Sequence, residues 1–118
     1  MVISLDLKKL IEENILSLST VDKGNHPHLI CVMYAKVLDS DKVLITDNFM
    51  KETILNIQNN NSVALSFFVG EAGFELKGAA QYFTKGSYLE LVKNIPENKG
   101  LPSKGAILVN VSELKRMG

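Results

Sequence analysis

The segment 46–53 combines residue types that can bind an anion. An apolar strand-like run ends there, and residues with helical spacing follow. If Asp47 or Asn48 caps that helix, the N–H groups of its first turn have no acceptor inside the helix. Lys51 and the hydroxyl of Thr53 can reach the same space, so the segment suits a phosphate monoester.

An ordinary capped surface helix explains the same residues. Glu52 would then complement the helix dipole, and the side chain of Lys51 would be solvated. A carboxylate next to a bound phosphate is unfavourable, so Glu52 argues against an anion site. Local sequence alone favours the capped helix, because such helix starts are far commoner than phosphate sites.

Two histidines and the single cysteine lie close together in the sequence, at His26, His28 and Cys31. Residues three apart in a strand point to opposite faces, so His28 and Cys31 are not expected to form a nucleophile–base pair. His26 belongs to a turn, and the sequence has no third histidine to complete a zinc set. We predict no metal site, and a half-buried free thiol.

Neither common glycine-rich phosphate loop is present in the sequence. Lys77 and Gly78 lie instead within an apolar, strand-like segment. A glycine in a strand marks a bulge, a bend of a barrel or a ligand close to the backbone.

The composition indicates one domain spanning residues 1–118. Thirteen basic and thirteen acidic residues cancel, which argues against a nucleic-acid or membrane-surface partner. No apolar run approaches the ~20 residues of a membrane helix. A lone cysteine and an N-terminus without a secretory signal pattern favour the cytoplasm.

Periodicity predicts a mainly β chain with a few helices. The expected helices span residues 5–13, 50–59 and 86–94, and the expected strands span 15–21, 28–38, 42–46, 62–69, 73–83 and 106–114. The first three strands should form a meander. Strands that are apolar on both faces favour a small six-stranded antiparallel barrel. The outer face of strand 28–38 should meet a second subunit, which predicts a homodimer.

Four segments, in this order and spacing, resemble one known family. They are LSTVDKGNHPHLICVMY, VLITDNFMKETILNI, NNSVALSFF and ELKGAAQYFTKG. Together they resemble the pyridoxamine 5′-phosphate oxidase-like family of FMN-binding split barrels, and most closely its short FMN-binding members. The resemblance extends from about Leu5 to Val111. It implies a six-stranded antiparallel split β-barrel, with FMN bound at the interface of a homodimer.

The resemblance also implies which residues bind the cofactor. Strand residues 29–33 would run beside the isoalloxazine ring, residues 45–48 along the ring and ribityl chain, and residues 50–53 at the phosphate. The implied cofactor-binding residues are Leu29, Ile30, Cys31, Val32, Met33, Ile45, Thr46, Asp47, Asn48, Met50, Lys51, Thr53, Lys77 and Gly78. Close relatives often have lysine just before the threonine, where this chain has Glu52.

The family implies a non-covalent FMN-binding flavoprotein that acts in electron transfer or as a flavin-dependent oxidoreductase with a small-molecule or protein redox partner. No side chain is expected to be catalytic, because the flavin carries the redox chemistry. The alternatives are a flavin or haem carrier or sensor without turnover, and a deazaflavin-dependent reductase. The arginine-bearing C-terminal segment of true pyridoxamine-phosphate oxidases is not expected here. The irregular loop 95–104 is the segment expected to reach a partner's site.

Overall fold

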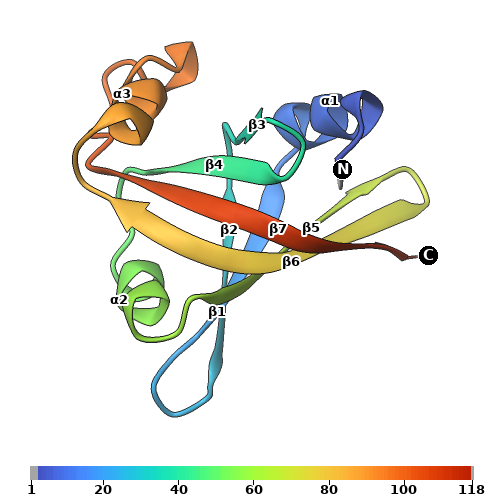
Figure 1. The fold of residues 1–118 in the computed structure, drawn as a ribbon, viewed down its shortest axis with the longest axis horizontal. Coiled ribbons are helices and arrows are strands. Elements are labelled where there is room, and N and C mark those ends of the chain that lie inside the picture. Colours follow the sequence, from blue (N-terminus) through green and yellow to red (C-terminus); the bar gives the residue numbers. More distant parts are fainter. Residues whose placement is uncertain (1–2, 118) are drawn as a thin grey trace.

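The computed structural model describes residues 3–117, and all strand pairs of its seven-stranded sheet are antiparallel. Figure 1 shows the sheet with its helices. The elements are α1 (Leu5–Glu13), β1 (Leu16–Val21), β2 (Pro27–Val32), β3 (Lys36–Leu38), β4 (Lys42–Asp47), α2 (Glu52–Asn59), β5 (Ser62–Val69), β6 (Ala72–Phe83), α3 (Ser87–Lys93), a 3₁₀ turn (Pro96–Asn98) and β7 (Gly105–Met117). No helix within residues 3–117 is long and apolar enough to cross a membrane.

The mainly β antiparallel class is confirmed, but the expected strand 28–38 and the expected meander are wrong. The chain leaves its extended course after β2, where Tyr34 has a left-handed φ of 62°, and resumes as β3. The strand order is β2-β1-β5-β6-β7-β4-β3, so these two pieces form opposite edges of the sheet. The sheet therefore has seven strands rather than six, and no hydrogen-bonded pair of the described strands closes it into a barrel.

The short link between the two edges forces the sheet to curl. Val32 ends β2 and Lys36 begins β3, and four Cα steps span at most about 14 Å. Strands at opposite ends of the sheet order must therefore lie near each other. This curvature encloses the main apolar core, to which α1 and α2 contribute Leu7, Ile11, Ile54 and Ile57.

The centre of the sheet is buried on both faces because α3 covers the outside of β4 and β7. Val43 and Ile45 of β4 face the main core. Between them, Leu44 packs against Leu89 and Val92 of α3 in a second apolar cluster. Figure 1 shows α3 beside one end of these strands, with α2 on the other side of β6. The two clusters explain why the strands lack a polar face.

The pairing of β6 with β7 contains a bulge at Gly78. Lys77 pairs with Glu113 and Gly78 pairs with Val111, so Ser112 is an extra residue on β7. A Cβ at position 78 would overlap the backbone carbonyl oxygen of Asn110. The glycine is therefore required by close approach of two backbones, one of the structural roles expected from the sequence.

Replacing Gly78 by alanine should lower the free energy of unfolding by about 1–3 kcal/mol, because the backbone of β7 must shift. Urea denaturation measures the change. Gly24→Ala is a matched control, since its methyl group meets the exposed imidazole of His26, which can turn away. Equal stability of Gly78→Ala and the wild type would contradict the close approach.

Candidate functional site

A pocket of about 690 Å³ lies between β2 and the segment that links β4 to α2. Its size is within the usual range for small-molecule sites. The lining residues are Ile15, His28, Ile30, Cys31, Val32, Met33, Tyr34, Thr46, Asn48, Phe49, Met50, Lys51, Glu52, Thr53 and Leu101. Most of these side chains are apolar, and the polar ones come mainly from residues 46–53.

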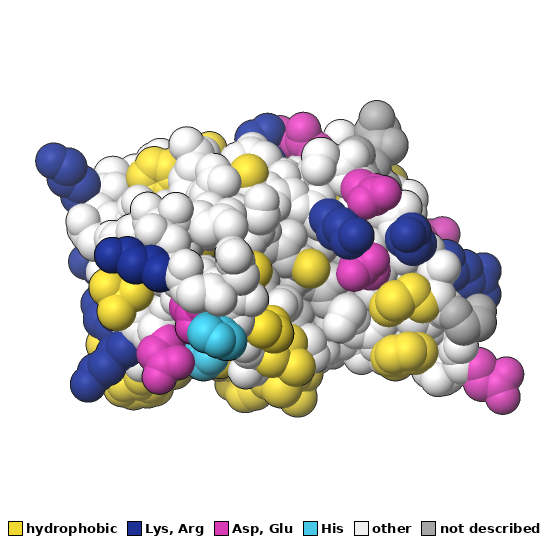
Figure 2. All heavy atoms as spheres, turned by 90° about the horizontal axis from the view of Figure 1, so that it is seen from below, with side chains coloured by type: hydrophobic (Ala, Val, Ile, Leu, Met, Phe, Trp, Pro, Cys, Tyr) yellow, Lys and Arg dark blue, Asp and Glu magenta, His cyan; other side chains and the backbone are white. Residues whose placement is uncertain are grey.

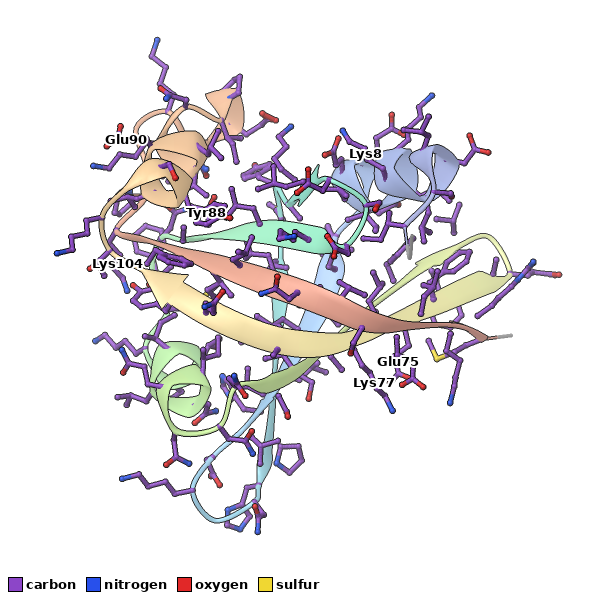
Figure 3. The ribbon with its side chains drawn as sticks, in the orientation of Figure 1. Lys8, Glu75, Lys77, Tyr88, Glu90 and Lys104 are labelled. Atoms are coloured by element: carbon purple, nitrogen blue, oxygen red, sulfur yellow. The ribbon has the colours of Figure 1, made fainter. Side chains whose placement is uncertain are left out.

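The buried carboxylate of Asp47 fixes the turn that leads into the pocket. One oxygen accepts a hydrogen bond from the N–H of Met50 at 2.8 Å. The other accepts from the Tyr82 hydroxyl at 2.6 Å and from Lys104 Nζ at 2.7 Å. Lys104 Nζ also donates to the carbonyl oxygen of Met50 at 2.8 Å, and Figure 3 shows Lys104 near the start of β7. The carboxylate thus joins the 47–50 turn to β6 and β7.

A second polar cluster holds the end of β4 to the loop before β7. The buried amide of Asn98 donates to the Thr46 hydroxyl at 2.8 Å and to the carbonyl oxygen of Val92 at 2.9 Å. The Asn48 side chain accepts from the N–H of Ser103 at 2.8 Å. This loop therefore packs on its own chain and contributes Leu101 to the pocket.

The first backbone N–H groups of α2 have no acceptor in the described part of the chain. The helix begins at Glu52 rather than at the expected residue 50, and Lys51 precedes it without a capping side chain. Asp47 bonds to Met50 instead, so the predicted cap by Asp47 or Asn48 is wrong. In the described part of the chain, the N–H groups of residues 52–54 donate no hydrogen bond. Lys51, Glu52 and Thr53 line the pocket, so the start of α2 offers N–H donors and a cation to this end of it, next to a carboxylate.

The carboxylate of Glu52 meets an imidazole on the opposite wall. His28 Nδ1 of β2 lies 3.4 Å from Glu52 Oε2. The His28 side chain is 30% exposed and that of Glu52 is 76% exposed. On the face shown in Figure 2, histidine, acidic and hydrophobic side chains lie next to one another. Of the described residues that line the pocket, Lys51 is the only lysine or arginine.

Nine of the fourteen predicted cofactor-binding residues line this pocket. They are Ile30, Cys31, Val32, Met33, Thr46, Asn48, Met50, Lys51 and Thr53. Cys31 is exposed rather than half-buried.

The other five predicted residues lie outside the pocket lining. Leu29 is exposed on the outer face of β2, Ile45 is in the main core, and Asp47 supports the turn from behind. Lys77 and Gly78 lie at the bulge of β6, where Figure 3 shows Lys77 beside Glu75 and far from Lys104.

Six lining residues were not among those predicted to bind the cofactor: Ile15, His28, Tyr34, Phe49, Glu52 and Leu101. His28 and Glu52 are distant in the sequence, and no local pattern connects them. Within residues 3–117, no group of three His, Cys, Asp or Glu side chains could hold a metal ion.

Comparison with known proteins identifies the family. Residues 6–118 match the family model described as pyridoxamine 5′-phosphate oxidase, so the chain belongs to this family. A similar protein is the uncharacterized protein MJ0282 of Methanocaldococcus jannaschii, which is 32% identical over 92% of this chain and 76% of its own length.

Two solved structures share the fold. HupZ of Group A Streptococcus has a TM-score of 0.87 with 23% identity, over 98% of this chain and 94% of its own. An FMN-binding protein from Syntrophomonas wolfei has a TM-score of 0.79 with 14% identity, over 87% of this chain and 76% of its own.

Tyr82→Phe should lower the free energy of unfolding by about 1–3 kcal/mol at neutral pH, because it removes a hydrogen bond to a carboxylate. Burial and the hydrogen bond to Asp47 raise the pKa of Tyr82 above its usual 10.0. The stabilisation should therefore be complete below pH 10 and decline as the pH rises above 10 toward the higher folded-state pKa. Urea denaturation of both proteins from pH 7 to 11 measures this. A stability difference that stays constant above pH 10 would contradict the assignment.

Proposed function

We propose that the protein binds FMN non-covalently in this pocket and acts in electron transfer or as a flavin-dependent oxidoreductase. The observation that carries the proposal is an apolar pocket with a lysine and free backbone N–H donors at one end. Lys51 and the unpaired N–H groups of residues 52–54 supply that end. A flavin mononucleotide has the complementary halves, namely a flat aromatic ring and a phosphate.

The residues of the pocket fit the two halves of this cofactor. Ile30 and Val32 of β2, with Met33 directly after the strand, supply an apolar wall for the ring. Thr46 and Asn48 line the same pocket and supply polar atoms for the ribityl chain. The flavin supplies the redox chemistry when bound, and the chain supplies binding, orientation and hydrogen bonds. Membership of the family and the likeness to an FMN-binding protein support the assignment.

Titration of FMN fluorescence with the purified protein tests the proposal. We expect quenching with about one site per chain, because a protein has few small-molecule pockets of this kind. The isolated protein should also be yellow, with an absorbance band in the blue. No quenching by added protein would overturn the proposal. Turnover with reduced nicotinamide nucleotides and an electron acceptor would separate an enzyme from a carrier without turnover.

Lys51→Ala should weaken FMN binding about tenfold, because it removes a charge-assisted contact to the phosphate. Riboflavin has the same ring without the phosphate, so its affinity should not change. Lys93→Ala, an exposed lysine of α3 outside the pocket lining, is the control. If Lys51→Ala binds FMN as tightly as the wild type, the phosphate is held elsewhere.

The proposal includes a homodimer that covers the mouth of the pocket. Large apolar side chains are exposed there and on the outer face of β2: Ile15, Leu29, Met33, Phe49 and Leu101. Such a group of exposed apolar residues favours burial by a second copy.

Leu29→Glu should shift the protein to monomer, because it places a charge on the exposed face of β2 where Leu29 is 67% exposed. Sedimentation velocity measures the mass. Leu91→Glu, on the exposed side of α3, is the control and should leave the dimer intact. A monomeric wild type, or a Leu29→Glu variant that remains dimeric, would contradict this interface.

A further inference from the structure

We infer that His28 and Glu52 together couple phosphate binding to protonation, so that the ligand's phosphate binds together with a proton on His28. This inference rests on the proposed function and concerns the same site. It assigns a role to two lining residues that the flavin assignment leaves without one. It also accounts for a carboxylate at the first residue of a helix that faces an anion.

The contact itself joins the two walls of the pocket. His28 belongs to β2 and Glu52 is the first residue of α2, and their side chains approach to 3.4 Å. Both line the pocket together with Lys51. The carboxylate is therefore next to the N–H groups that would otherwise attract a phosphate.

Few other ionisable groups on the neighbouring elements can affect the charge on His28. Neither β1, which pairs with β2, nor α2 outside Glu52 contains an ionisable side chain. On the β1–β2 turn, Asp22 and His26 are paired with each other at 3.2 Å, and Lys23 is exposed.

The remaining ionisable neighbours are Asp47 and two residues of the pocket lining. Asp47 is buried and bonded to Lys104 and Tyr82. Besides Lys51, the pocket's other ionisable lining residues are the thiol Cys31 and the phenol Tyr34.

The charge balance of the pocket wall thus depends on His28. While its imidazole is neutral, the charges of Lys51 and Glu52 cancel, and a phosphate dianion meets N–H donors and Lys51 in a wall without net positive charge. When the imidazole binds a proton, it neutralises Glu52 and leaves the wall with one positive charge. Binding of the dianion adds negative charge beside His28, so it should draw a proton onto the imidazole.

Calorimetry of FMN binding in two buffers with different ionisation enthalpies measures the protons taken up. At pH 7 the wild type should take up more protons than His28→Gln. His26→Gln is the matched control, because its imidazole lies outside the pocket lining, and it should behave as the wild type. The phosphate's own titration is common to all three proteins, so their differences report only the histidine.

Affinity provides the second readout. Between pH 6 and pH 8 the wild type should lose about three- to tenfold more FMN affinity than His28→Gln. Glu52→Gln should bind FMN more tightly than the wild type at pH 8, and Glu71→Gln, on the exposed β5–β6 turn, should not. Riboflavin should show neither effect, because it has no phosphate.

Equal proton uptake by the wild type and His28→Gln, or Glu52→Gln affinity equal to that of the wild type at pH 8, would overturn the inference while leaving FMN binding intact. If the wild type does not bind FMN at any pH, the proposed function is wrong instead. The same two-buffer measurement with inorganic phosphate as the probe then decides the inference: uptake that is lost in His28→Gln supports it, and uptake that is unchanged or absent overturns it.

Discussion

The buried carboxylate of Asp47 determines the shape of the candidate site without facing it. A buried charge is costly unless it is paired and fully hydrogen-bonded. Asp47 meets that requirement through Tyr82, Lys104 and the N–H of Met50. These partners come from β6, the start of β7 and the turn after β4. Satisfying one carboxylate therefore fixes the turn against the sheet and directs the following residues into the pocket. Gly105 makes room for this arrangement, since a Cβ there would overlap the Tyr82 ring.

In this arrangement, the residue that holds the turn in place differs from the groups that would bind the phosphate. Because Asp47 bonds to Met50, it does not cap α2, and the first N–H groups of that helix remain available. Lys104 is bound to Asp47, and its charge mainly neutralises that buried carboxylate. Lys51 therefore remains as the cation of the pocket. Glu52 is turned toward His28. The same short segment therefore has one acidic residue that builds the site and another that modulates it.

Local sequence predicted the elements whose stability is local. Residues 5–13 form the expected helix, with Ser4 as its cap, and residues 62–69 form the expected strand. Local sequence did not predict the features that depend on residues distant in the sequence. The start of α2 depends on Tyr82 and Lys104, which lie 35 and 57 positions from Asp47. The division of strand 28–38 depends on one left-handed residue, which the apolar pattern does not reveal. Residue types alone drew attention to the lining residues within 46–53, whereas those of β2 were named only through the family resemblance, which carries spatial information that periodicity lacks.

A crystal structure of the protein with FMN tests the central claim most directly. The account predicts phosphate oxygens within hydrogen-bond distance of the first N–H groups of α2 and of Lys51 Nζ. The flavin ring should lie against Ile30 and Val32 of β2, and the hydrogen bonds of Asp47 should be unchanged. A phosphate bound away from the start of α2, or a ring outside this pocket, would contradict the account.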